Sequence, residues 1–108
     1  MIGCVFVKSI DWNIPKAEIG YFVDHRHTGK GIVTKAVSRV VQYCFEKLGL
    51  RKLLIKTHES NIGSRRVAEK NGFRIEGTIR NDHKTTDGQI LDMIYYGLTR
   101  DDQIPIMD

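Results

Sequence analysis

The feature that most constrains the fold is an amphipathic segment, residues 33–48, which lies between two β-prone runs. The apolar residues that recur at helical spacing on one side of it are Val33, Ala36, Val37, Val40, Val41, Cys44, Phe45 and Leu48,. Gly49 follows as a helix stop signal,. The β-prone runs are residues 16–23 and 51–58. Strand, helix and strand in this order predict a right-handed crossover between parallel strands, and therefore an α/β fold with a mixed central sheet.

The loop before this helix carries the spacing Arg26-x-x-Gly29-x-Gly31. The helix is expected to open on glycine and backbone rather than on a strong capping side chain. The first N–H groups of a helix have no internal partner and carry partial positive charge, and glycine lets a bulky anion approach them. The loop is therefore either a phosphate cradle or an ordinary turn capped by Thr28, because short glycine motifs recur by chance.

The chain before the loop predicts two antiparallel strands. Residues 1–9 are apolar and β-prone, and residues 11–15 form a turn in which Pro15 blocks the ladder,. In the strand of residues 16–23, alternation places Glu18, Gly20 and Phe22 on one face and Ile19, Tyr21 and Val23 on the other,. Gly20 inside a strand indicates a bulge or a close approach.

A second, shorter helix is expected over residues 62–71. Asn61 is placed as its N-cap, and Gly72 as its stop,. Val67 and Ala68 are expected to face the core.

A C-terminal β-hairpin is expected after the second helix. Its strands are residues 73–84, interrupted at Gly77, and residues 89–98, joined at the turn signal Asp87-Gly88,. Residues beyond Asp101 read as a tail.

Composition limits the chain to one domain, residues 1–108, and narrows the function classes. Of the residues, 41% are hydrophobic, which suits a globular core,. The net charge of +4 is scattered, which fits an anionic cofactor, and the sequence lacks the basic stripe with aromatics that nucleic-acid binders carry,. Cys4 and Cys44 have neither metal nor redox spacing, so a reduced, cytosolic compartment fits best,. Neither a signal peptide nor a membrane-spanning stretch is expected.

Several short motifs follow one another in a specific order and spacing between residues 1 and 100. They are Ala17-Glu-Ile-Gly-Tyr-Phe22, Arg26-x-x-Gly29-x-Gly31-Ile32, Asn61-x-x-Ser64-x-x-Val67-Ala68-Glu69-Lys70-x-Gly72-Phe73, Glu76-Gly77 and the hairpin from Asp87-Gly88 to Tyr95. In this order they resemble the C-terminal two-thirds of a GNAT N-acetyltransferase of the RimJ/RimL ribosomal-protein type. The resemblance implies a GNAT-like central sheet with a βαβ crossover and a C-terminal hairpin.

The resemblance implies acetyl-CoA as acetyl donor and a primary amine as acceptor, either a protein N-terminal amine or a small amine. Backbone N–H groups that would hold the pyrophosphate belong to His27, Thr28, Gly29, Lys30, Gly31, Ile32 and Val33. Backbone of Phe22 and Val23 would pair with the pantetheine arm, and Asn61 would bond the arm, cap its helix or do both. Parallel strands that diverge at their carboxyl ends open a crevice for ligands, where the thioester would sit.

The same resemblance assigns a candidate acid. Many members of the family use a tyrosine on the second helix to protonate the departing thiolate, but this chain has Ala68 at that position. Ser64, one turn earlier, matches the polar residue of the RimL-like branch and takes the role by resemblance,. The alternative is that Ser64 is a helix-face hydroxyl near the N-cap.

Glu18 and His83 compete as the general base that takes a proton from the acceptor ammonium. Glu18 lies in the family's Ala-Glu-Ile-Gly run, on the strand beside the crevice. His83 lies where RimL-like relatives often carry an acidic residue, and histidine ordinarily titrates near neutral pH,. The structural alternatives are a hydrogen-bonded carboxylate for Glu18 and a solvated strand-end histidine for His83. No histidine spacing indicates a metal site.

The first residues resemble the third strand of the family, and the resemblance implies that full-length members carry an N-terminal strand and two helices before this segment. The donor site is therefore expected to be largely intact and the acceptor site incomplete, and a sheet with less cover can favour homo-oligomers. Two functions follow: an acetyl-CoA-dependent N-acetyltransferase, or a non-catalytic acyl-CoA-binding module left from a truncated transferase.

Overall fold

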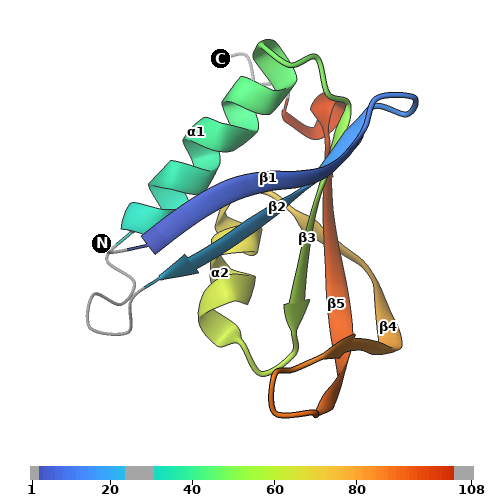
Figure 1. Ribbon diagram of the computed structural model, residues 1–108. Coiled ribbons are helices and arrows are strands. Elements are labelled where there is room, and N and C mark those ends of the chain that lie inside the picture. Colours follow the sequence, from blue (N-terminus) through green and yellow to red (C-terminus); the bar gives the residue numbers. More distant parts are fainter. Residues whose placement is uncertain (1–2, 24–30, 104–108) are drawn as a thin grey trace.

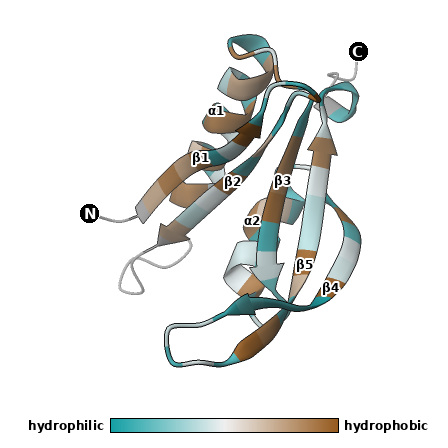
Figure 2. Ribbon diagram, turned by 45° about the vertical axis from the view of Figure 1, so that its right-hand side comes forward, coloured by the Kyte–Doolittle hydropathy of each residue, from teal (hydrophilic) through white to brown (hydrophobic). Residues whose placement is uncertain are grey.

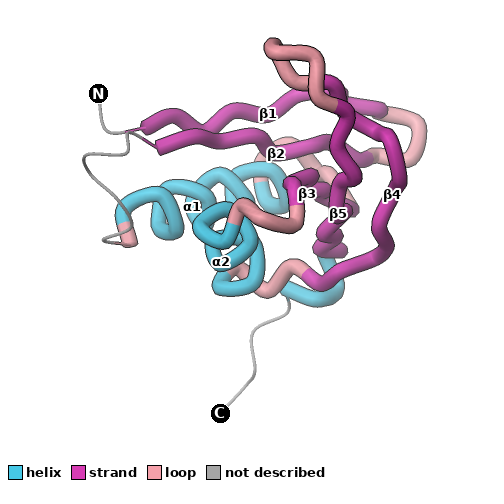
Figure 3. The backbone as a smooth tube through the Cα atoms, turned by 90° about the horizontal axis from the view of Figure 1, so that it is seen from below, coloured by secondary structure: helices cyan, strands magenta, loops and turns pink. Residues whose placement is uncertain are grey.

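A five-stranded mixed sheet with two helices on one of its faces makes up the fold (Figures 1 and 3). The structure is a computed structural model that describes residues 3–23 and 31–103. The strands are β1 (Gly3–Asp11), β2 (Lys16–Val23), β3 (Lys52–His58), β4 (Arg74–Lys84) and β5 (Ile90–Thr99), in the order β1-β2-β3-β5-β4. The helices are α1 (Ile32–Glu46) and α2 (Ile62–Lys70), followed by a short 3-10 helix, η2 (Arg100–Gln103). The α/β class and each predicted strand and helix are confirmed.

The crossover through α1 joins two parallel strands, as predicted. β2 pairs with β3 in parallel at Lys16–Lys52, Ala17–Leu53 and Glu18–Leu54, whereas β1–β2, β3–β5 and β4–β5 are antiparallel. α1 ends at Glu46, two residues earlier than the periodicity predicts, because the N–H groups of Lys47 and Leu48 both donate to the Tyr43 carbonyl. Gly49 then takes a φ of +70°, which turns the chain toward β3,.

One hydrophobic core lies between the sheet and the two helices. Alternate residues of each inner strand point into it, such as Leu53 and Ile55 of β3, and the apolar stripe of α1 covers them,. The other principal members are Ala17, Ile19, Val37, Val41, Cys44, Phe45, Ala68, Ile94, Tyr96 and Leu98. Each fully buried aliphatic side chain contributes about 1.5–3 kcal/mol, so this layer fixes where the ends of the strands and helices lie.

Gly20 makes the close approach that its place inside β2 predicts. The ring of Phe6, from β1, lies on the position that a Cβ of residue 20 would occupy. Phe6 and Gly20 are register partners, and they lie on the sheet face turned away from the helices, because their neighbours along the strands, Val5, Val7, Ile19 and Tyr21, face the core,. Glycine at this position lets an aromatic ring from the neighbouring strand lie flat against the backbone.

The C-terminal hairpin forms as predicted, with a register shift between Ile75 and Gly77 where the sequence indicated an interruption. The turn closes when the Thr85 N–H donates to the Gln89 carbonyl over 2.8 Å, and Gly88 adopts a φ of +90°,. Neither α1 nor α2 is long and apolar enough to cross a membrane, within the residues described here.

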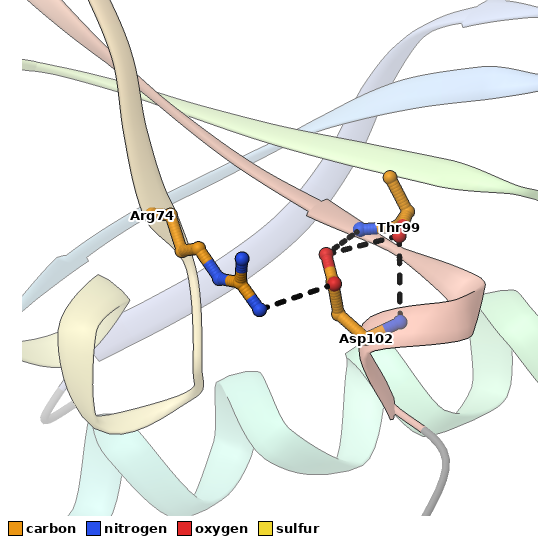
Figure 4. A network of polar contacts seen from close by, with 3 residues as sticks. All are labelled: Arg74, Thr99 and Asp102. Carbon is orange, nitrogen blue, oxygen red and sulfur yellow. Dashed lines mark hydrogen bonds and ion pairs between the residues drawn. The ribbon is translucent and has the colours of Figure 1, made fainter.

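The prediction of a tail beyond Asp101 is wrong for residues 102–103, which belong to η2. Asp102 folds back so that its carboxylate accepts hydrogen bonds from the N–H (3.0 Å) and hydroxyl (2.9 Å) of Thr99, and pairs with Arg74 at 3.4 Å (Figure 4). The two Thr99 bonds hold the pKa of Asp102 below its usual value. Thr99-x-x-Asp102 has the spacing of a capping box, a signal that the sequence contains and that the interpretation above overlooked,.

Candidate active site

β2 and β3 separate from each other after three paired residues. Pairing ends at Glu18 and Leu54, yet β2 continues through residues 19–23 and β3 through residues 55–58. Figure 1 shows the two strands diverging toward their carboxyl ends, and Figure 2 shows that β3 is hydrophobic in its middle and hydrophilic at that end. We call this divergence the fork. It is the splay that the sequence predicted, and it occupies the place where ligands bind in sheets of this kind.

Gly31 forms the start of α1, at the same end of the sheet as the fork (Figure 1). It is the N-cap, has a φ of +79° and makes no side-chain cap bond. The predicted glycine start is confirmed, and Thr28, the alternative cap, lies outside the described residues. The N–H groups of the first turn, at Ile32 and Val33, have no partner inside the helix, and the helix dipole adds partial positive charge. Among the described residues other than its chain neighbours, no atom lies within 4 Å of the position that a Cβ of Gly31 would take. These residues therefore fit an anionic group such as a pyrophosphate; residues 27–30, also predicted to hold it, lie outside the described part.

Asn61 forms the start of α2, and its predicted capping role is confirmed. Its Oδ1 accepts a hydrogen bond from the Ser64 N–H at 3.1 Å, and its carbonyl accepts from the Arg65 N–H at 3.0 Å. The helix then runs to Lys70, one residue shorter than predicted, with Asn71 as its C-cap. The Asn61 cap fixes the first turn of α2, and with it the backbone of Ser64.

Ser64 lies across the fork from β2, where it meets a residue that sequence reasoning did not select. Tyr21 donates its hydroxyl proton to the Ser64 carbonyl at 2.6 Å, and the Ser64 hydroxyl donates to the Tyr21 oxygen at 3.0 Å. Tyr21 lies on the helix-facing side of β2, as the alternation predicted, and beyond its last pairing with β3. Burial raises the pKa of Tyr21, although the Ser64 hydrogen bond opposes the shift. The sequence could have indicated Tyr21, because alternation places it near the carboxyl end of the strand, on the same face as Ile19,.

α2 is also held by contacts away from the fork. The buried Tyr96 of β5 donates its hydroxyl to Glu69 at 2.9 Å and accepts from Arg65 Nε at 3.1 Å. The Tyr96 hydrogen bond raises the pKa of Arg65. At the other end of the helix, the Asn71 side-chain amide donates to the Thr34 carbonyl of α1 at 3.2 Å. α2 is therefore joined to β2, β5 and α1.

Glu18 lies where the fork begins, on the sheet face turned away from the helices. Its two carboxylate oxygens are paired with different lysines, Lys8 of β1 and Lys56 of β3, each at 3.5 Å. The Lys56 ammonium also lies 4.7 Å from the centre of the Tyr95 ring. Burial opposes the charge of Lys56, but Glu18 and Tyr95 outweigh it and raise the pKa of this lysine. An acceptor amine that used Glu18 would have to compete with two ammonium groups.

His83 lies on the edge strand β4, opposite Leu91 of β5, and is exposed. β5 lies between β4 and β3, and β3 lies between β5 and the strand that carries Glu18. Neighbouring strands are about 4.8 Å apart, so three such steps put His83 about 14 Å from β2. The structure therefore brings Ser64 and Tyr21 together and leaves the two candidate bases apart.

Phe22 and Val23 close β2, opposite Cys4 and Gly3 of β1, so their backbone has a paired edge on the β1 side. On the β3 side their pairing has already ended, which leaves that backbone edge directed at the fork. Among residues 3–23 and 31–103, no group of three or more His, Cys, Asp or Glu side chains is arranged to hold a metal ion.

Comparison with known proteins identifies relatives over most of the chain. Residues 1–74 match the family described as Acetyltransferase (GNAT) domain. The Bacillus subtilis protein YjcK, named as an N-acetyltransferase, is 44% identical over 78% of this chain and 47% of its own length. The ribosomal-protein-serine acetyltransferase of Escherichia coli is 34% identical over 74% of this chain and 45% of its own length.

Solved structures agree with this likeness. Mycobacterium smegmatis RimJ, in complex with CoA-disulfide, superposes with a TM-score of 0.90 at 27% identity, over 96% of this chain and 50% of that protein. The chain thus spans about half the length of the relatives that it matches.

Proposed function

The chain belongs to the GNAT acetyltransferase family, and from that premise we propose that it moves an acetyl group from acetyl-CoA to a primary amine. The observation that carries the proposal is the fork between β2 and β3, which opens at the same end of the sheet as the Gly31 helix start and is spanned by Tyr21 and Ser64. This arrangement supplies an anion site, a strand edge and a hydroxyl around one opening. RimJ, a structural neighbour, was crystallised with a CoA derivative, which supports CoA as the ligand class.

Each part of the opening has a role toward the donor. The first-turn N–H groups of α1 would hold the pyrophosphate, and the free edge of Phe22 and Val23 would pair with the amides of the pantetheine arm,. Acetyl-CoA supplies a thioester, in which a new C–N bond replaces the C–S bond when the amine attacks. Ser64 would give its hydroxyl proton to the departing thiolate, and solvent would then restore that proton; its hydrogen bond to Tyr21 of β2 supports this role,.

The acceptor we propose is the N-terminal amine of a ribosomal protein. The Escherichia coli relative is named as a ribosomal-protein-serine acetyltransferase, and this is the support for a protein acceptor. A small amine is the other outcome that the experiment below can return.

A second function, CoA binding without transfer, is favoured by one observation. Glu18 has both oxygens paired with lysines, and His83 lies two strands away from β3, so neither candidate base faces the Ser64 hydroxyl. The groups proposed to bind acetyl-CoA thus lie around the fork, whereas the candidate bases for the acceptor amine do not lie near Ser64.

Calorimetry with CoA and a thiol-release assay with acetyl-CoA separate these functions. The assay would use N-terminal peptides of ribosomal proteins, the same peptides with acetylated N-termini as controls, and small diamines. Acetylation of free N-termini, checked by mass spectrometry, supports the protein acceptor, whereas activity on diamines alone supports a small one. Tight CoA binding with no transfer to any amine would leave the binding module as the function, and absence of both would remove the proposal.

The base is tested by two matched substitutions, Glu18→Gln and His83→Gln. If His83 is the base, His83→Gln lowers the rate at saturating substrate and removes the pH dependence of the wild type, and Glu18→Gln leaves both unchanged. If Glu18 is the base, Glu18→Gln lowers the rate and His83→Gln leaves the profile unchanged. A rate and profile that neither substitution alters would assign proton removal to water.

A further inference from the structure

The two contacts between Tyr21 and Ser64 fix which hydroxyl donates to which. A carbonyl oxygen can only accept, so the 2.6 Å contact with the Ser64 carbonyl uses the single hydroxyl hydrogen of Tyr21,. The 3.0 Å contact between the hydroxyl oxygens must then be a donation from Ser64 to Tyr21,. The Ser64 hydrogen therefore points at Tyr21, and the Ser64 oxygen keeps its lone pairs free on its other sides.

Every polar group of Ser64 near the fork has a partner. Its N–H donates to Asn61 at 3.1 Å, and its carbonyl and hydroxyl are both engaged by Tyr21. These contacts select one position for a side chain that would otherwise rotate freely on an exposed helix turn. Asn61 fixes the backbone, so the hydroxyl direction depends on Tyr21.

Tyr21 is suited to a lasting role of this kind. It is partly buried, and burial raises the pKa of its phenol, so it keeps its hydrogen throughout the neutral and mildly alkaline range. It also comes from β2, whose other edge is held by β1, so its position does not depend on α2. A hydroxyl on a rigid strand can therefore orient a hydroxyl on the helix across the fork.

We propose that Tyr21 is a positioning residue, which holds the Ser64 hydroxyl at the fork and directs its hydrogen until the CoA thiolate replaces Tyr21 as the acceptor. This rests on the proposed transfer reaction, in which Ser64 serves the departing sulfur. When the thiolate forms, the Ser64 hydrogen turns from the Tyr21 oxygen to sulfur, while Tyr21 stays bonded to the Ser64 carbonyl. Tyr21 thus acts through Ser64 and need not touch the substrate.

Kinetics of Tyr21→Phe, Ser64→Ala and the double variant test the proposal. Loss of one orienting hydrogen bond, about 1.4 kcal/mol, predicts a kcat about tenfold lower in Tyr21→Phe, with CoA affinity unchanged within about twofold. The double variant should be no slower than Ser64→Ala, because Tyr21 acts only through that hydroxyl. Full kcat in Tyr21→Phe, or additive losses in the double variant, would overturn the proposal.

Tyr96→Phe is the matched control, because it removes the same atom from another tyrosine that holds α2, through Arg65 and Glu69. It should lower the melting temperature and leave kcat within about twofold of wild type, because the two lost hydrogen bonds join α2 to β5 and do not touch Ser64,. If Tyr96→Phe lowered kcat as much as Tyr21→Phe does, both losses would be explained by weaker support of α2, and this result would contradict the proposal.

An NMR measurement tests the same contact between Tyr21 and Ser64, and it requires neither turnover nor a Tyr21 variant that folds. The Cζ resonance of Tyr21, in protein labelled with ¹³C-tyrosine, should move when CoA is added to wild type. It should move much less with desulfo-CoA, which lacks the sulfur, and much less in Ser64→Ala. Equal movement in all three would overturn the proposal. Absence of acetyl transfer by wild type would count against the proposed function instead, and the resonance would then decide the role of Tyr21 by itself.

Discussion

The two helices of this protein begin in opposite ways. α1 begins on Gly31, in a left-handed conformation and with no side-chain cap, whereas α2 begins on Asn61, whose side chain bonds the third residue of the helix. In the described part of the chain, the start of α1 has no side-chain cap, whereas the Asn61 cap of α2 bonds the Ser64 N–H,. We propose that the start of α1 receives an anionic ligand, whereas the start of α2 holds the backbone of Ser64 in place.

The largest expected effect is a loss of CoA affinity in Gly31→Glu, which adds a charged side chain at the start of α1. The new carboxylate would lie where the pyrophosphate is proposed to bind, and like charges in contact cost several kcal/mol, so CoA affinity should fall more than about a hundredfold. Gly31→Ala is the control, because it introduces the same unfavourable φ at a cost of about 1–2 kcal/mol without charge,. Calorimetry that finds equal CoA affinity in the two variants would remove the anion site.

The next largest effect comes from separating the two helices with Asn71→Ala. The Asn71 side-chain amide donates to the Thr34 carbonyl of α1 and to the Val67 carbonyl of α2, so Asn71→Ala removes two hydrogen bonds and should cost about 1–3 kcal/mol,. Urea denaturation measures this loss. Val67→Ala shortens a neighbouring side chain on the same helix and keeps both bonds, so a similar loss there would assign the effect to packing alone.

Removing the N-cap of α2 with Asn61→Ala should lower the stability by a smaller amount. Removing an N-cap side chain costs about 1 kcal/mol, and Asn61→Ser should recover most of it because serine also caps helices,. CoA affinity shows whether Asn61 has a second role toward the pantetheine arm: it should fall in both variants if Asn61 bonds the arm, and in neither if Asn61 is only a cap. Unchanged stability in Asn61→Ala would contradict the contrast between the two starts.

The smallest effect is expected far from both starts, at Asp102. The Thr99 bonds lower the pKa of Asp102 in the folded state, so its contribution to stability is present above the ordinary pKa of aspartate and is lost as the pH falls through the folded value,. Asp102→Asn should therefore flatten the acid side of the stability curve below about pH 4. Asp101→Asn changes a neighbouring carboxylate, and an equal flattening there would assign the acid dependence to general charge.

Local sequence was sufficient wherever a structure depends on neighbouring residues. The glycine start of α1, the Asn61 cap and the Asp87-Gly88 turn each involve groups within a few positions of one another, so residue type and spacing predict them,. The Thr99–Asp102 pair is equally local, because the Thr-x-x-Asp spacing predicts a capped helical turn at this position,. Predictions based on side-chain period alone were less accurate, as at the end of α1, since the last turn is set by shared bonds to Tyr43.

The sequence by itself determined the strands, the helices, their starts and the family resemblance, because periodicity, capping and turn chemistry act over short stretches of chain. Only the tertiary structure decided what surrounds the candidate residues. Tyr21 and Ser64 are 43 positions apart, and the lysines on Glu18 come from two other strands. These contacts depend on the order and register of the strands and on how α2 packs against the sheet. Sheet order, register and packing are set only when the whole core forms.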